Sequence, residues 1–476
     1  MNFQLLLPQI FIFVWAILLF VLDFASKEKK HNLAYPALLG IVIAITLVLT
    51  SQKGELFGGM FVADSFSVFF NLIFLLTGFL TIASSVDVAK RFHSNQGEYF
   101  GLILLSMVGM MFLACAGELL TLYVSLELAT IPLYVLASYR KDQLKSSEAG
   151  LKYLILGGIS SALLLYGISL IYGLTGTTFL GEVKSRLIIS FLSQGGIGPA
   201  LVLGFIFMIA GFGFKLALVP FHMWVPDVYE GAPTPITAFL SVASKAAGIA
   251  AFLRVFYKSF LLFQVDWVLL MAVLAALAMI LGNIIALLQG NIKRMLAYSS
   301  IAQIGYILLG VVAATARGVA SVAFYTFVYL FANMGAFMAA IAFSNITGSD
   351  EIKDYAGLSR KTPALAAMMA VFMLSLVGIP PLAGFVGKYY LFSAAIQQGY
   401  IWLVIVAVLT SVVSLYYYLG VVRQMYFQAT TQESSVSTGA MLKIALIICV
   451  VGVLLFGVYP NIFLDLANQA AMVFRY

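Results

Sequence analysis

Long runs of apolar residues, separated by short polar stretches, follow one another along the whole chain of 476 residues. Each run has about the 20 residues that a helix needs to cross the hydrocarbon core of a bilayer. The pattern predicts a single membrane domain over residues 1–476, all-α, with about fourteen transmembrane helices. We expect these helices near residues 4–23, 34–50, 62–85, 98–116, 119–139, 149–174, 197–218, 235–257, 267–288, 295–315, 319–345, 363–397, 400–427 and 440–459.

The composition supports this prediction. Only 9% of the residues are charged and 63% are hydrophobic, and the mean hydropathy is +1.05. Soluble proteins carry about 25% charged residues, so water is not the main solvent of this chain.

The loop cations predict the orientation, because Lys and Arg accumulate in cytoplasmic loops. With the N-terminus outside, the inner loops and their borders hold fifteen: Lys27, Lys29, Lys30, Lys90, Arg91, Arg140, Lys141, Lys145, Lys293, Arg294, Lys353, Arg360, Lys361, Arg423 and Lys443. The outer loops then hold six: Lys53, Lys184, Arg186, Lys258, Arg317 and Arg475. Both termini are therefore expected on the outer face of the membrane. The net charge of +7 follows from this bias and indicates no nucleic-acid partner.

The sequence offers no pattern for a cofactor or a metal. Its two cysteines, Cys115 and Cys449, lie far apart in apolar spans and are expected to be small buried side chains. The three histidines, His31, His93 and His222, are scattered, which argues against haem. There is no P-loop and no G-x-G-x-x-G motif for a nucleotide. We expect no cofactor chemistry in this chain.

Four ionisable residues fall deep inside apolar spans. They are Glu127 in "LYVSLELATIPLY", Lys215 in "GFGFKLALVPFHMW", Lys245 in "SVASKAAGIA" and Lys388 in "GIPPLAGFVGKYY". A Lys or Asp at the centre of a bilayer costs roughly 2.5 to 3.5 kcal/mol on insertion scales, and such residues mark ion or proton pathways. We therefore expect these four residues to transfer protons rather than to serve packing alone.

Three further charges have a structural alternative. Lys152 in "EAGLKYLILGG" and Glu148, one helical turn earlier, lie near a helix start. They are candidates for proton transfer, but a snorkelling side chain or a surface pair is an open alternative. Arg254 lies near the outer end of its span, where we favour a structural role.

Prolines next to two of the buried lysines predict helix breaks. Pro220 follows Lys215 by five residues, and the pair Pro380–Pro381 precedes Lys388. Broken helices at membrane depth are tolerated where they line a cavity or are buried in protein. In transporters, two broken helices in corresponding halves indicate the transport site.

The halves of the chain correspond in spacing. Glu127 and Lys215 are 88 residues apart, and Gln303 and Lys388 are 85 residues apart. Five predicted spans in residues 98–260 precede five more in residues 261–428, and an odd number inverts the second copy. The sequence predicts two inverted five-helix repeats, with breaks in the seventh and twelfth helices. Residues 1–97, with helices 1–3, and residues 429–476, with helix 14, flank them.

Several stretches resemble the antiporter-like membrane subunits of respiratory complex I, and most closely the N-type subunits with their cyanobacterial and chloroplast relatives. In chain order they are "LELATIPLY", "EAGLKYLILGG", "GFGFKLALVPFHMWVPDVYEGAPTP", "ASKAAGIA", "GNIIALLQGNIKRMLAYSSIAQIGY", "DYAGLSRKTP" and "GIPPLAGFVGKYY". Seven stretches in order, over essentially the whole chain, make the resemblance specific.

The resemblance implies a role for each buried charge. Glu127 and Lys215 match the family's paired Glu and Lys, and Lys245 matches its central Lys. Lys388 matches the last Lys of a second half-channel, where the M type has Glu. With no long lateral helix after the last span, the N type is favoured over the L type.

Two positions add detail to this implication. Lys152 and Glu148 match residues on the sixth helix of the N type. Gln303 stands where many pumping subunits have His, as in the cyanobacterial and chloroplast relatives. Since Gln takes up no proton near pH 7, we expect it to be a polar relay with transfer through water.

The resemblance implies a proton-translocating subunit of a complex I-type NAD(P)H- or ferredoxin–quinone oxidoreductase, an enzyme in which this chain lies in the lipid bilayer. Its partners would be other membrane-arm subunits, and NADH and quinone would be handled by other subunits of the complex. The membrane would be a cell inner or thylakoid membrane, with both termini on its periplasmic or lumenal side. Two interpretations stay open beside it: a subunit of a multi-subunit sodium/proton antiporter, and a membrane scaffold that transports nothing.

Overall fold

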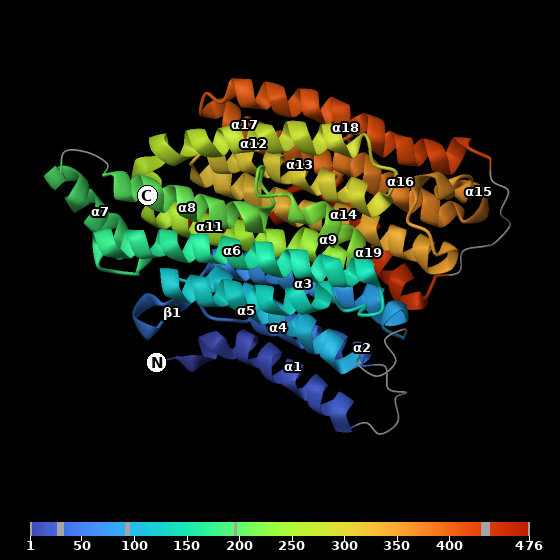
Figure 1. The fold of residues 1–476 in the computed structure, drawn as a ribbon, viewed down its shortest axis with the longest axis horizontal. Coiled ribbons are helices and arrows are strands. Elements are labelled where there is room, and N and C mark those ends of the chain that lie inside the picture. The colour runs from blue at the N-terminus through green and yellow to red at the C-terminus, as the bar shows by residue number, and fades with distance from the viewer. Residues whose placement is uncertain (1, 26–32, 91–95, 195–197, 430–437, 475–476) are drawn as a thin grey trace.

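The protein is a bundle of long helices that lie side by side in the computed structural model, which describes residues 2–25, 33–90, 96–194, 198–429 and 438–474 (Figure 1). The α-helices are α1 Leu7–Ala25, α2 Ala34–Leu49, α3 Ser65–Ala89, α4 Gln96–Cys115, α5 Leu119–Ala137, α6 Leu144–Thr175, α7 Leu180–Gln194, α8 Pro199–Leu216, α9 Trp224–Gly231, α10 Thr234–Phe239, α11 Lys245–Ser259, α12 Gln264–Ala286, α13 Ile292–Val312, α14 Ala316–Thr347, α15 Leu358–Lys361, α16 Pro363–Val377, α17 Ala383–Gln397, α18 Ile401–Phe427, α19 Ala440–Val458 and α20 Asn461–Ala471. Shorter elements are the strands β1 Gly54–Leu56 and β2 Phe61–Ala63, the 3₁₀ turns Phe3–Leu6, Phe57–Gly59, Leu261–Phe263, Ile352–Tyr355 and Met472–Phe474, and the π-helical turn Leu240–Ser244.

The predicted all-α membrane fold is confirmed. Among the described residues, twelve helices are long and apolar enough to cross a membrane. Two shorter apolar helices, Ala34–Leu49 and Pro363–Val377, occupy two further predicted spans. The exact number of fourteen crossings stays a prediction. Five of the loop cations, Lys27, Lys29, Lys30, Arg91 and Arg475, and two histidines, His31 and His93, lie outside the described residues.

The centre of the bundle is formed by α14 and by the segment Thr234–Ser259. In both, every residue of the most apolar stretch is buried. In α1, α6, α18 and α19, by contrast, only 33 to 39% of that stretch is buried, as expected for helices that face lipid. The candidate residue Lys245 thus lies at the centre of the protein.

A small β-hairpin marks one end of the bundle, which we call the hairpin end. Its two antiparallel strands pair Gly54 with Ala63, and Phe61 also bridges to Ala116 after α4. Phe474, near the C-terminus, packs its ring on that of Phe66 at the start of α3. Both chain ends lie at the hairpin end (Figure 1).

A buried ion pair closes the hairpin end. Arg254 of α11 donates hydrogen bonds of 2.6 and 2.7 Å to Asp64, the N-cap residue of α3, and one of 2.9 Å to the carbonyl of Ala114. Burial opposes the charge on Asp64, but the guanidinium of Arg254 outweighs it and holds the pKa of Asp64 below its usual value. These contacts join three helices, as the structural interpretation of Arg254 predicts.

Both predicted helix breaks are present. The helix α8 ends at Leu216, where Ala217 takes a left-handed conformation with φ of 61°, and α9 starts at Trp224. The helix α16 ends in the same way, with Gly378 at φ of 95°, and α17 starts at Ala383. Such ends leave carbonyl groups without a partner in the helix, available to other donors.

The structure also contains elements that the sequence did not predict, among them two helices, the hairpin and a π-helical turn. The helices α7 and α20 contain too many polar residues for a search that relies on long apolar runs, and the hairpin is too short for it. The π-helical turn Leu240–Ser244 directly precedes Lys245 inside an apolar span, and no single residue type signals it. Such turns are frequent at functional sites.

Close packing of α4 on α5 depends on Gly109. A Cβ atom there would lie 2.2 Å from the amide nitrogen of Ala129. We expect Gly109→Ala to push α5 away and to lower the free energy of unfolding by about 1 to 3 kcal/mol. Gly158→Ala, in α6 with no heavy atom within 4 Å, is the matched control. It should be neutral or stabilising by up to about 1 kcal/mol. Thermal unfolding in detergent measures both, and equal melting temperatures would contradict this close contact.

Candidate functional site

Three lysines are buried inside the bundle, and we call them the buried lysines. The exposed fraction is 3% for Lys215, 2% for Lys245 and 4% for Lys388. In the described part of the chain, no carboxylate lies within 4 Å of any of the three ammonium groups. Their polar partners are hydroxyl and carbonyl groups instead.

The first two buried lysines bond to neighbouring helices. Lys215, in the last turn of α8, donates a hydrogen bond of 2.6 Å to the hydroxyl of Thr130 in α5. Lys245, the first residue of α11, donates to the hydroxyl of Ser300 in α13 at 2.8 Å and to its carbonyl at 3.0 Å. Both ammonium groups are thus held by neutral oxygen atoms.

The third buried lysine spans the second helix break. Lys388, in α17, donates 2.9 Å to the carbonyl of Val377 at the end of α16, and 3.0 Å to the hydroxyl of Ser411 in α18. Its ammonium also lies 4.2 Å from the centre of the Tyr306 ring. Lys388 and Ser411 line a cavity of about 360 Å³. The broken helix therefore supplies a ligand to the lysine that follows it.

Glu127 and Lys215, which the resemblance pairs, form no ion pair within 4 Å. The carboxylate of Glu127 accepts a short hydrogen bond from Ser161 of α6, and that hydroxyl lies 3.1 Å from the hydroxyl of Tyr123. Thr130, the partner of Lys215, lies three residues after Glu127 on the same helix. The two charges are therefore linked through one turn of α5 rather than by an ion pair.

Gln303 is the centre of a hydroxyl cluster inside the second half. The amide oxygen of Gln303 accepts a hydrogen bond of 2.5 Å from Tyr325 of α14. The amide nitrogen donates to the carbonyl of Leu376 at 3.0 Å and to Tyr418 at 3.4 Å. Tyr418 also forms a short hydrogen bond with Ser299. We call Ser299, Gln303, Tyr325 and Tyr418 the Gln303 cluster.

A second set of polar contacts reaches Lys388. The hydroxyl of Tyr306 accepts from the amide of Asn283 at 3.1 Å and donates to Thr410 at 3.2 Å. Tyr417, the neighbour of a member of the Gln303 cluster, donates to Asn283 at 3.0 Å. The ring of Tyr306 lies against the ammonium of Lys388, so this set of contacts ends at the third buried lysine.

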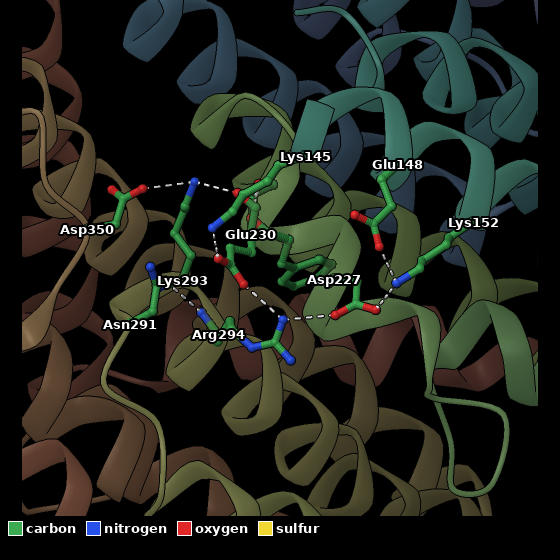
Figure 2. Close-up of polar contacts among 11 residues, drawn as sticks. Lys145, Glu148, Lys152, Asp227, Glu230, Asn291, Lys293, Arg294 and Asp350 are labelled. Carbon is green, nitrogen blue, oxygen red and sulfur yellow. Dashed lines mark hydrogen bonds and ion pairs between the residues drawn. The ribbon is translucent and has the colours of Figure 1, made fainter. Parts of the chain in front are cut away.

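Glu148 and Lys152 belong to an ion-pair network, which Figure 2 shows. It lies where α6 starts, at the end of the bundle opposite the hairpin (Figure 1). Lys152 lies 2.6 Å from Glu148 and 2.6 Å from Asp227 of α9. Arg294 of α13 lies 2.8 Å from Asp227 and 2.9 Å from Glu230. The side chain of Lys152 is 40% exposed, so the structure places it apart from the buried lysines.

The network continues through two more lysines. Lys145 of α6 pairs with Glu230 at 2.7 Å. Lys293 of α13 donates to the carbonyl of Glu230 at 2.6 Å and pairs with Asp350 at 3.0 Å. Burial opposes the charge on Glu230, but hydrogen bonds from Lys145 and Arg294 outweigh it and keep its pKa below the usual value. The network thus ties the helix after the first break to α6 and α13.

Several contact residues of the site were missed in the sequence. Thr130, Ser300 and Tyr418 are uncharged polar residues in apolar spans, a common occurrence that gives no signal by itself. Asp227 and Arg294 stood inside matched stretches, but only the fold shows that they meet. Among the described residues, no three His, Cys, Asp or Glu side chains gather as a metal site requires.

Comparison with known proteins identifies the family. The family described as "NADH:quinone oxidoreductase/Mrp antiporter, TM" matches residues 116–414, more than half of the chain. The chain belongs to this family. The matched region contains all three buried lysines, both helix breaks and the ion-pair network.

Relatives of high similarity cover nearly the full length. The chain is 44% identical to NADH-quinone oxidoreductase subunit N of Desulforamulus reducens, over 99% of each chain. It is 48% identical to the protein of the same name from Moorella thermoacetica, over 94% of this chain and 93% of the other. A chain in the structure of respiratory complex I from Thermus thermophilus is 34% identical, with a TM-score of 0.82 over 97% of this chain and 99% of that one.

The ion-pair network generates a prediction about stability. Arg294→Gln removes the cation shared by Asp227 and Glu230, so the free energy of unfolding should fall by about 1 to 2 kcal/mol. Arg423→Gln, an exposed residue of α18 outside the network, should change it little. Thermal unfolding at low and high salt measures this difference, which salt should reduce. If the two variants melt at the same temperature, the network does not stabilise the fold.

Proposed function

We propose that this chain moves protons across the membrane as a membrane-arm subunit of a complex I-type NAD(P)H- or ferredoxin–quinone oxidoreductase. The observation that carries the proposal is the set of three buried lysines, each held by neutral oxygens and two of them beside helix breaks. Family membership and the names of the full-length relatives support it. Its partners are the other membrane-arm subunits, and NADH and quinone would be handled by other subunits of the complex.

Each buried charge has a proposed role. The buried lysines take up and release protons in turn. None of them has a carboxylate in direct contact, so an ammonium group can lose its proton without breaking an ion pair. Glu127 modulates the charge of Lys215 through α5. Gln303 is a neutral polar relay between the second and third lysine, because an amide binds hydrogen-bonding partners but holds no additional proton.

The inverted repeat is part of the proposal. We assign residues 98–260 and 261–428 to the two copies, flanked by 1–97 and 429–476. In support, α4 packs along α5 as α12 packs along α13. Also, α6 contacts α8 as α14 contacts α16. Both α8 and α16 end in a left-handed residue at the break. Each copy would then contain one half-channel, and the two half-channels would open to opposite faces of the membrane.

For Glu148 and Lys152 we propose a positioning role. Lys152 holds Asp227, in the helix that directly follows the first break, and Glu148 holds Lys152. The exposure of Lys152 supports this role over proton transfer at depth. The network would thereby fix α9 while Lys215 changes its charge.

The two other interpretations have less support. The sodium/proton antiporter shares the family, but the relatives of 44 and 48% identity are subunits of quinone oxidoreductases. A scaffold without transport would gain nothing from three buried ammonium groups, which are costly at membrane depth.

Proton pumping in the assembled complex tests the proposal. Lys215→Ala and Lys388→Ala should assemble but lose coupled pumping by at least about tenfold, the lower range for loss of a proton-transfer group. Lys388→Arg should be at best partly active, because guanidinium does not release its proton.

The control for this experiment is Lys258→Ala, a lysine at the hairpin end outside the row of buried lysines. It should pump normally. Intact complexes of Lys215→Ala and Lys388→Ala that pump at the rate of this control would refute the proposed function.

We also propose that the ion-pair end is cytoplasmic, in accord with the fifteen inner and six outer cations. Both termini are then periplasmic or lumenal. A reporter fused after residue 476 should work only if it is an enzyme active outside the cytoplasm. If a reporter that works only in the cytoplasm is active at this position, the assigned orientation is wrong.

A further inference from the structure

Three polar residues form a stripe along one face of the central helix α14. Tyr325, Tyr329 and Asn333 follow one another at intervals of four, so their side chains point to the same side. Tyr325 donates to Gln303 in the Gln303 cluster. Asn333 donates 2.6 Å to Ser241, in the π-helical turn that leads to Lys245. The stripe thus runs from the Gln303 cluster toward the central lysine.

The middle residue of this stripe has a hydroxyl group without a protein partner. Tyr329 is 3% exposed, and its hydroxyl finds no hydrogen-bond partner among the described residues. A buried hydroxyl without a partner is unfavourable, and in proteins such groups normally bind an ordered water. The ring is held in place, since it stacks on that of Tyr325 with centres 6.5 Å apart.

Groups on both sides face Tyr329. Tyr229, Tyr418 and Tyr325 are the tyrosines near enough to influence its hydroxyl electrostatically. Tyr229, in α9, is also buried with an unpartnered hydroxyl, and its ring centre lies 6.0 Å from the ammonium of Lys245. Tyr418 and Tyr325 belong to the Gln303 cluster. Tyr329 therefore stands between the second buried lysine and the cluster that leads to the third.

We propose that the hydroxyl of Tyr329, with a bound water on either side, is the proton-relay group between Lys245 and the Gln303 cluster. This inference rests on the proposed function and adds a catalytic residue to it. The relay supplies the connection that Gln303 cannot supply by taking up a proton itself.

The transfer conserves protons and charge at each step. The ammonium of Lys245 gives a proton to the first water and becomes a neutral amine. The hydroxyl of Tyr329 accepts a proton at a lone pair while its own proton passes to the second water. The shift continues through the hydroxyl groups of the Gln303 cluster and through bound water, with the amide of Gln303 only orienting them, until the amine of Lys388 becomes an ammonium. No tyrosinate forms, so the phenol needs no change of charge.

The test is Tyr329→Phe in the assembled complex, which removes one oxygen atom and keeps the ring. The matched control is Tyr355→Phe: its hydroxyl is equally buried and unpartnered, but its ring stacks on Phe343, outside the stripe. We expect Tyr329→Phe to lower the pumping rate at least about tenfold, as loss of a transfer group does. The control should pump normally.

Two further variants keep the test decisive. Tyr418→Phe, on the far side of the proposed relay, should lower the pumping rate in the same way. Tyr329→His should pump faster than Tyr329→Phe, because imidazole also accepts and donates protons. A structural role of the hydroxyl would not be rescued by His. Subunit content of the purified complex shows that each variant has assembled.

The outcomes separate this inference from the proposed function. If Lys245→Ala stops pumping while Tyr329→Phe and Tyr418→Phe pump normally, the relay is refuted and the proposed function stands. If Lys245→Ala also pumps normally, the proposed function itself fails. A loss in Tyr329→Phe that equals the loss in Tyr355→Phe would likewise overturn the relay.

Discussion

An ammonium group at membrane depth must find oxygen atoms, and this requirement organises the interior of the protein. Lys215, Lys245 and Lys388 find them in hydroxyls and carbonyls of neighbouring helices rather than in carboxylates. Neutral oxygens hold an ammonium less strongly than a carboxylate does, and they also bind a neutral amine. A buried lysine in this setting keeps a defined position in both of its charge states, as a group that repeatedly exchanges a proton must.

The irregular backbone serves the same requirement. The break after α16 frees the carbonyl of Val377 for Lys388. The π-helical turn Leu240–Ser244 directly precedes Lys245, whose ammonium donates a hydrogen bond to Ser300. Because backbone without regular hydrogen bonds is tolerated in a membrane only inside protein, these segments lie in or next to the central helices. The ion-pair network at one end and the pair Arg254–Asp64 at the other hold these helices in place.

The sequence predicted the parts of the fold that depend on long apolar runs and on rare residues within them. Lys215 and Lys388 beside prolines indicated both breaks correctly, because each feature is improbable in a lipid-facing helix. The contacts of the site could not be predicted, since Thr130, Ser300 and Tyr329 resemble many other polar residues in helices. The resemblance pairs Glu127 with Lys215, but it does not predict that they are connected through Thr130, one turn of α5 from Glu127, rather than by direct contact, because this detail depends on helix rotation.

If the buried lysines carry the protons, they must change protonation during turnover. Infrared difference spectroscopy on the assembled complex, with isotope-labelled lysine, measures this directly. Lysine ammonium bands should appear and disappear with the redox cycle and should diminish in the Lys245→Ala complex. Lysine bands that stay constant during active pumping would contradict this expectation.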